Sequence, residues 1–155
     1  MSKTRRITAA SVCAVGAVAG AIAMAGPAFA AGTGTAVYNC TDSVGGSYPG
    51  VTVKYVRNSA SVLTLTAAIS SPAPIGVGDI TGNVSWATNP PAPIGGLVNT
   101  TTTNPIVLSA PTSTALPTAP ANVDLSIHSG GSGGPVIATV HCGWSSTTSW
   151  PVGGI

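Results

Sequence analysis

Short runs of alternating apolar and polar residues follow one another along the chain from residue 35 onward. In one of them, Leu63, Leu65 and Ala67 on one face alternate with Thr64 and Thr66 on the other. A period of two is the pattern of a β-strand with one buried face. Seven such runs, bounded by turn residues, lie at residues 35–41, 51–57, 61–69, 79–87, 106–110, 123–128 and 136–142. Pro, Gly and β-branched residues interrupt every window long enough for a helix, so the pattern predicts an all-β domain.

The spacing of these runs is typical of a β-sandwich or a β-barrel. We expect a single immunoglobulin-like β-sandwich of about seven antiparallel strands, formed by residues 31–155. Cys40 and Cys142 lie in the first and last runs. A disulfide between them would join the terminal strands, which suits a sandwich, and would close a loop of about 100 residues, worth ~4–5 kcal/mol on the loop-entropy model. Two free thiols are the alternative, which an oxidising compartment disfavours.

The last two runs predict an antiparallel hairpin. Setting Val123 opposite Val140 turns the apolar residues of both runs inward together. In that register His141 lies opposite Asn122, and His128 lies near the hairpin loop, on the order of 20 Å away. The two histidines are then too far apart to share a metal ion.

Proline-rich segments separate some of the runs. The sequence Pro-Ala-Pro-Ile-Gly occurs at residues 72–76 and again at residues 91–95. A duplicated binding loop is one interpretation, but two stiff crossover loops explain so short a match better. Residues 111–120, rich in Thr, Pro and Ala, predict an extended linker.

Residues 1–30 have the pattern of a cleavable export signal. Three basic residues within the first six precede an Ala- and Gly-rich apolar stretch, and Ala28 and Ala30 provide the small residues of a cleavage site. A transmembrane anchor is the alternative, but Ala and Gly drive insertion into lipid only weakly. We therefore expect cleavage after Ala30, a secreted, extracellular protein and no membrane anchor after cleavage. The choice between the general and the twin-arginine export route stays open.

Charge is scarce after this signal. The cations are Lys54 and Arg57, and the anions are Asp42, Asp79 and Asp124, so the net charge of residues 31–155 is −1. Nucleic-acid binding needs a basic patch that displaces counterions from phosphates, and two separate cations make none. A surface of Thr, Ser, Asn and Gly suits neutral partners instead: cell-wall or other neutral polysaccharides, or further copies of the chain.

One segment resembles the nucleophile loop of trypsin-like serine proteases: Gly131–Val136, which contains Ser132. His141 follows in a segment similar to the one that holds the catalytic histidine of that family. The order of the two residues is reversed, the acidic residue before the serine is absent, and a nucleophile and its base must meet in space. Residues 31–155 also contain no Glu and only three Asp, so few pairs of carboxylates are available for general acid–base catalysis. We predict no enzyme, no catalytic residue, no cofactor and no metal site.

Tryptophans are the remaining candidates for contact with a ligand. Trp86 is in phase with Ile80 and Val84 and is predicted to lie in the core. Trp144 and Trp150 lie beyond the last clear run, where an exposed indole could stack on a sugar ring. They are our candidate ligand-contact residues.

The segments Val37–Thr41 and Ala138–Cys142, with the Thr/Pro-rich middle and the Ala/Gly-rich export signal, resemble a loose family of uncharacterised small secreted β-sandwich proteins of actinobacteria. The resemblance implies the fold and an extracellular location, and no activity or site residue. The disulfide between terminal strands is also similar to that of bacterial cellulose- and chitin-binding modules, in architecture alone.

These observations together predict a non-enzymatic extracellular or cell-envelope protein with an adhesive or structural role. A carbohydrate- or cell-wall-binding module is the second expectation, and a flat, exposed pair of Trp144 and Trp150 would favour it. A secreted inhibitor or small enzyme is the third, and a rigid protruding loop at residues 129–135 would favour the inhibitor.

Overall fold

The computed structural model describes residues 31–68, 74–87 and 93–155 as an all-β domain. Within these residues the chain forms eight strands and no helix. The strands are β1 (Gly32–Asp42), β2 (Ser47–Arg57), β3 (Val62–Ala67), β4 (Ile80–Ser85), β5 (Ile94–Asn99), β6 (Ile106–Pro111), β7 (Asn122–His128) and β8 (Val136–Ser149). The all-β prediction is confirmed, with one strand more than the seven expected. The predicted export signal, residues 1–30, lies outside the described residues.

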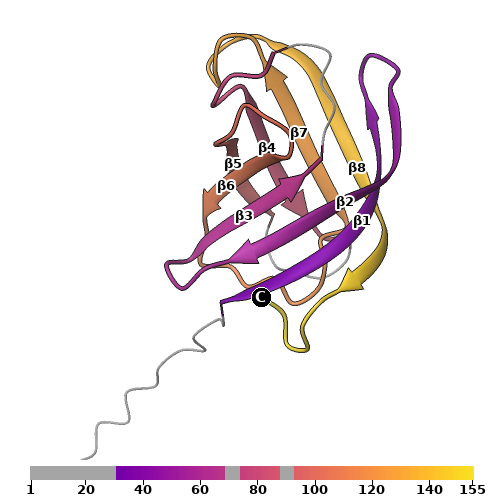
Figure 1. Cartoon of the computed structure of the whole chain (residues 1–155), viewed down its shortest axis with the longest axis vertical. Helices are drawn as coiled ribbons and strands as arrows, with labels where there is room; N and C mark the ends of the chain where they lie inside the picture. Colours follow the sequence, from indigo (N-terminus) through magenta and orange to yellow (C-terminus); the bar gives the residue numbers. More distant parts are fainter. Residues whose placement is uncertain (1–30, 69–73, 88–92) are drawn as a thin grey trace, which may run out of the picture.

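The strands close into a single barrel in the order β1-β2-β3-β6-β5-β4-β7-β8 (Figure 1). The predicted immunoglobulin-like sandwich is therefore wrong. β1 pairs antiparallel with β2 on one side and with β8 on the other. In a sandwich this strand would be at the edge of a sheet, whereas here both of its edges are hydrogen-bonded. Closure removes the unpaired edges that two separate sheets would leave.

The strand that the sequence pattern did not predict is β5. It bridges β4 and β6, and without it the barrel would be open. Its buried residues Ile94 and Leu97 are three positions apart because Gly96, at φ 72°, adopts a left-handed conformation between them. A bulge of this kind breaks the period of two, so the segment reads as a loop.

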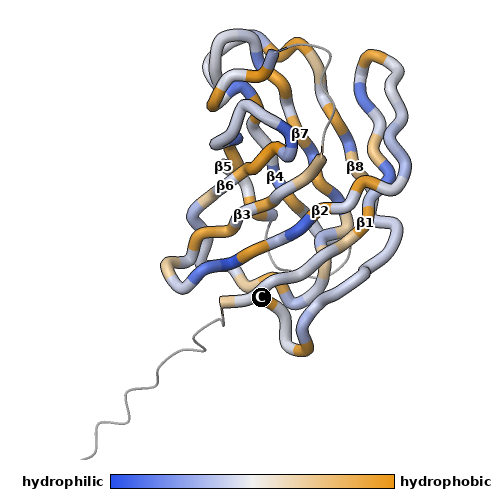
Figure 2. Tube along the Cα trace, in the orientation of Figure 1, coloured by the Kyte–Doolittle hydropathy of each residue, from blue (hydrophilic) through white to orange (hydrophobic). Residues whose placement is uncertain are grey.

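Inward-facing apolar residues fill the barrel along each strand. On β3 these are Leu63, Leu65 and Ala67, and on β7 they include Val123 and Leu125, as the alternation predicts. Apolar and polar positions alternate along the strands in Figure 2. Trp86 follows β4, is partly buried against the core and donates its indole N–H to the Thr118 carbonyl at 3.2 Å.

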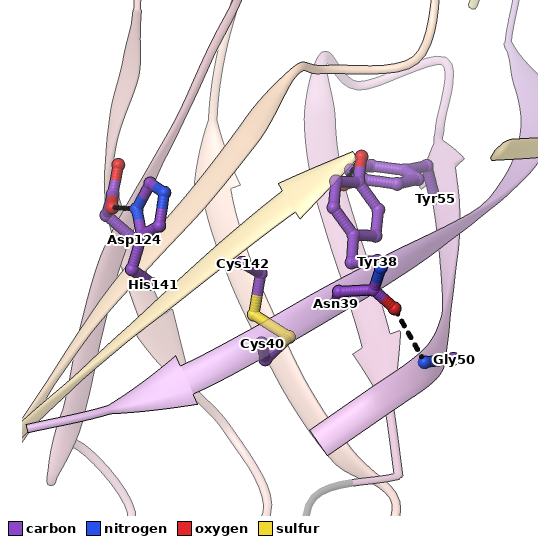
Figure 3. Close-up of a disulfide and its surroundings, with 8 residues drawn as sticks. All are labelled: Tyr38, Asn39, Cys40, Gly50, Tyr55, Asp124, His141 and Cys142. Atoms are coloured by element: carbon purple, nitrogen blue, oxygen red, sulfur yellow. Dashed lines mark hydrogen bonds and ion pairs between the residues drawn. A yellow bond between two sulfur atoms is a disulfide. The ribbon is translucent and has the colours of Figure 1, made fainter. Parts of the chain in front are cut away.

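The disulfide between Cys40 and Cys142 is confirmed (Figure 3). The two cysteines are direct partners in the β1–β8 ladder, at the seam where the chain's first and last strands meet. The bond therefore covalently links the two strands whose pairing closes the barrel, across a sequence separation of 102 residues.

The predicted register of the last hairpin is wrong by two residues. Val123 lies opposite Cys142 rather than Val140, and His141 lies opposite Asp124 rather than Asn122. The ladder slips where Ile127 pairs with Ala138 and the next residue of β7 pairs with Val136. Ile137 is left over as a bulge, which simple alternation does not reveal.

One end of the barrel is closed by aromatic side chains and by the C-terminus. Tyr38, Tyr55 and Trp150 pack there, and the rings of Tyr55 and Trp150 meet edge to face at 5.4 Å. The predicted linker comprises residues 111–120; Pro111 ends β6, and residues 112–120 cross this end. Leu116 and Ile155 exchange backbone hydrogen bonds of 2.8 and 2.9 Å, and both side chains are buried. The C-terminus accordingly lies beside the start of β1 in Figure 1.

Candidate functional site

A cavity of about 370 Å³ occupies the opposite end of the barrel, which we call the open end. The residues that line it belong to β1, β2, β3, β6, β7 and β8, to the turn between β1 and β2, to the residue after β3 and to the segment before β4. They are Cys40, Asp42, Val44, Tyr48, Val51, Val53, Leu65, Ala67, Ala68, Pro74, Ile75, Asp79, Leu108, Val123, Leu125, Ile127, His128, Ile137, Ala138, Val140 and Cys142. An eight-stranded barrel is just wide enough to be filled by side chains or to hold one small ligand, and here a space is left.

The cavity exists because of the size of the inward side chains. On β1 the inward position after Tyr38 is Cys40, and on β2 the inward position before Tyr55 is Val53. A row of large rings at the closed end thus gives way to a row of small and medium side chains at the open end. Most of the wall is aliphatic, and the disulfide forms part of it.

Polar groups of the lining include Asp42 and Tyr48 on the β1–β2 hairpin. The Asp42 carboxylate accepts hydrogen bonds from the backbone N–H of Val44 at 3.0 Å and of Gly46 at 2.6 Å, and from the Tyr48 hydroxyl at 2.8 Å. The Tyr48 hydrogen bond, followed by those from the backbone, lowers the pKa of Asp42, because they stabilise the ionised form. The same contact raises the pKa of Tyr48.

Asp79 and His128 form the other polar part of the lining. The Asp79 carboxylate accepts the N–H of Gly76 at 2.5 Å and of Gly131 at 2.7 Å, which ties the loop between β7 and β8 to the segment before β4. His128 contacts the Gly134 carbonyl through Nδ1 and the Thr81 hydroxyl through Nε2, both at 2.9 Å. Since a carbonyl only accepts, Nδ1 carries a proton.

The loop after β7 contains the protease-like segment. Ser132 is exposed there, while His141 lies five residues into β8, roughly 17 Å along an extended strand from its start. On the outer wall of the barrel, His141 Nδ1 contacts Asp124 Oδ1 at 2.5 Å, a pair that Figure 3 shows facing each other. The observed register of β7 and β8 sets His141 opposite Asp124, and it keeps His141 away from Ser132 and His128.

The two candidate ligand-contact tryptophans lie in different environments. Trp144 is within β8, its side chain is 51 % exposed, and its indole N–H donates to the Thr147 hydroxyl at 3.1 Å. Trp150 is partly buried at the closed end, where its N–H donates to the Leu116 carbonyl at 3.2 Å. A Cβ on Gly34 would overlap the Trp150 ring, so that glycine makes room for the indole. The two indoles do not form one flat surface.

Sequence reasoning missed the cavity. Alternation identifies which residues face inward, but not whether they fill the space that the strands enclose. The available signal was the contrast in residue size between neighbouring inward positions, such as Tyr38 and Cys40, and it has meaning only once the strands are known to close into a barrel.

No family model, curated protein or solved structure matches the chain in comparisons with known proteins. The part of the chain that the structure describes contains no helix long and apolar enough to cross a membrane. Within residues 31–68, 74–87 and 93–155, no three His, Cys, Asp or Glu side chains gather as a metal site requires.

Proposed function

We propose that the protein is a non-enzymatic binding protein that holds one small apolar molecule in the open end of its barrel. The observation that carries this proposal is the cavity of about 370 Å³ with its aliphatic wall. A concave site of this size, mostly apolar with a few polar groups at fixed positions, is typical of small-molecule binding.

The energetics favour an apolar occupant. Transfer of apolar surface from water into such a wall stabilises the bound state by ~25 cal/mol for each Å² buried. Val44 and Ile137 line the cavity and are 76 % and 56 % exposed. An apolar ligand would cover part of this surface, whereas a sugar would leave its hydroxyls without partners along the wall.

The proposal keeps the expectation of a protein without catalysis. Each ionisable side chain that lines the cavity has a structural hydrogen bond. Tyr48 donates to Asp42, which shapes the hairpin turn, and Asp79 and His128 hold the loop between β7 and β8. It also keeps the expectation of export, which the pattern of residues 1–30 and a stapling disulfide support. Outside the cell, such a barrel would carry an apolar molecule through water or retain it at the envelope.

A second candidate is attachment to neutral cell-wall polysaccharide through Trp144. The half-exposed indole, followed in the same strand by Ser and Thr residues, supports it. Trp150 does not extend that surface, since its ring packs on Tyr55. A single indole supplies less stacking area than a row, so this candidate ranks behind the cavity. An adhesive or structural role through self-association ranks behind both, because the cavity gives it no support.

Titration with the uncharged fluorophore N-phenyl-1-naphthylamine tests the proposal. We expect saturable binding of one molecule per wild-type chain. Ala67→Phe places a ring inside the cavity and should weaken binding by about tenfold or more, a change of ~1.4 kcal/mol or more. The matched control is Ala60→Phe, at an exposed alanine in the turn between β2 and β3.

The control should bind as the wild type does. Absence of saturable binding to the wild type, or equal affinity in Ala67→Phe, would overturn the proposed function. Trp144→Ala, assayed for retention on insoluble cell wall, chitin and cellulose, tests the second candidate. Unchanged retention removes it.

A further inference from the structure

Two carboxylates and one histidine line the cavity, and no Lys or Arg of the described residues does. Asp42 and Asp79 line it, and the cations of the described residues, Lys54 and Arg57, do not. Lys54 is exposed and lies between inward Val53 and Tyr55, so it points away from the barrel interior. Arg57 is buried near the closed end, two residues beyond Tyr55.

Neutral groups hold both carboxylates in place. Backbone N–H groups and the Tyr48 hydroxyl donate to Asp42, and the N–H groups of Gly76 and Gly131 donate to Asp79. These donors orient the carboxylates without cancelling their charge. The titratable groups that line the cavity are thus Asp42, Tyr48, Asp79 and His128. The Tyr48 hydroxyl donates to Asp42, and the two ring nitrogens of His128 contact Thr81 and Gly134.

The polar side chains also lie at one end of the cavity, at the rim of the barrel. Asp42 ends β1 and Tyr48 is the second residue of β2, so both belong to the hairpin at the open end. Asp79 directly precedes β4, and His128 ends β7. Deeper positions carry Val53, Leu65 and Leu108. A ligand that fits this arrangement has an apolar body for the interior and a polar head for the opening.

From these observations, and resting on the proposed function, we infer that the cavity takes amphiphiles with an uncharged or cationic head and rejects those with a carboxylate head, such as fatty acids. A carboxylate placed at this opening would meet two like charges beside an apolar wall, where the reduced dielectric constant strengthens repulsion. A cationic head would be attracted by the same two groups, and a hydroxyl head could donate to them.

The test compares three ligands with the same ten-carbon chain: decanol, decyltrimethylammonium and decanoate. Each displaces N-phenyl-1-naphthylamine from the wild-type protein, below its micelle concentration and at about pH 8, where decanoate is ionised. We expect decanol and decyltrimethylammonium to compete, and decanoate to bind about tenfold more weakly or worse. Added salt should narrow the difference between the two charged ligands, because it screens partly exposed charges.

Asp42→Asn and Asp79→Asn identify the source of the selectivity. Each should strengthen decanoate binding relative to decyltrimethylammonium, because one negative charge at the opening is removed. The matched control is Asp124→Asn, on the outer wall, which removes the same charge without touching the cavity. The comparison of three ligands on the wild type needs no variant, so it decides the inference even where a variant folds poorly.

Decanoate binding as tight as decanol binding would overturn the inference and leave the proposed function standing. The same holds where Asp124→Asn shifts selectivity as much as Asp79→Asn does, because the effect would then come from net charge. Absence of binding by the fluorophore and by all three ligands would instead overturn the proposed function.

Discussion

The two ends of the barrel are built from the same strands and differ in the size of the side chains that face inward. At the closed end, Tyr38, Tyr55 and Trp150 fill the interior, and Leu116 and Ile155 cover it. At the open end, Val, Ala, Leu and the disulfide line a cavity of about 370 Å³. Strand pairing sets the width of the barrel, and side-chain size decides which part of the interior is packed core and which part is a cavity.

Polar atoms follow the same division. Buried hydroxyls at the closed end satisfy one another: Tyr55 donates to Tyr38 at 2.7 Å, and Tyr38 donates to the Pro120 carbonyl at 2.9 Å. Burial raises the pKa of both tyrosines well above the ordinary value, so they stay neutral donors. At the open end the polar side chains are two carboxylates, a tyrosine and a histidine at the rim of the cavity. The proposed function thus assigns stability to the closed end and an exchangeable occupant to the open end.

The largest effect should follow from emptying the closed end. Tyr55→Ala removes a fully buried ring and leaves the Tyr38 hydroxyl with one partner fewer, so we expect a loss of about 3–5 kcal/mol in the free energy of unfolding. Chemical denaturation measures it. Tyr55→Phe, which removes only the hydroxyl, should cost ~1 kcal/mol. A loss below about 1 kcal/mol in Tyr55→Ala would show that this end is not the stable part.

The disulfide lies at the boundary between the two ends, one inward position from Tyr38. Replacing both cysteines, Cys40→Ala and Cys142→Ala, should lower the free energy of unfolding by about 2–5 kcal/mol, since the bond constrains a long loop of the unfolded chain. Thermal unfolding of the double variant measures the effect. Mass spectrometry of the unreduced wild type should show no free thiol among residues 31–155. Both thiols alkylating in native, exported protein would contradict the structure.

Two alanines compare the ends directly. Ala36, fully buried on β1, lies on the closed side, and Ala67 lines the cavity. Ala36→Leu should overpack the closed end and cost about 1–3 kcal/mol, whereas Ala67→Leu has space to occupy and should change stability by less than ~0.5 kcal/mol. Equal losses for the two variants would mean that the open end is packed as tightly as the closed one.

The smallest effect concerns pH and the hairpin at the open end. Because the folded-state pKa of Asp42 is lowered, its stabilising contribution is present above the ordinary aspartate value of about 3.9 and is lost as pH falls through the lower, folded pKa. Stability of the wild type should therefore fall in this acid range. Asp42→Asn, compared with Asp124→Asn as control, should show a shallower fall. The same slope in both variants would remove Asp42 as the cause.

Much of this fold follows from the sequence, and the part that does not has a specific cause. Alternation located most strands and their inward residues, and two cysteines predicted the correct disulfide. Closure was missed because β5 carries a left-handed Gly96, which moves Leu97 out of phase with Ile94. The hairpin register was missed because a shift of two residues keeps every side chain on the same face, so alternation does not distinguish the predicted register from the observed one. The bulge at Ile137 shifts the pairing by one further residue near the loop, which alternation does not reveal either.

The site was harder to predict than the fold for a different reason. Trp144 and Trp150 look alike in sequence, and what separates them is packing against Gly34 and Tyr55, more than ninety residues away. A cavity is likewise a property of many distant residues together, so no local motif encodes it. Asp42 and Asp79 look like ordinary turn residues in the sequence, and only the barrel brings both to one opening.

The most direct test of the account is where an apolar ligand contacts the barrel. Methyl-labelled wild-type protein, mixed with decanol, should show intermolecular nuclear Overhauser effects to the methyl groups of Val53, Leu65 and Val140 at the open end. Leu116 and Ile155, at the closed end, should show none. Contacts confined to the outer wall around Trp144, or equal contacts at both ends, would contradict the division of the barrel into a filled end and a binding end.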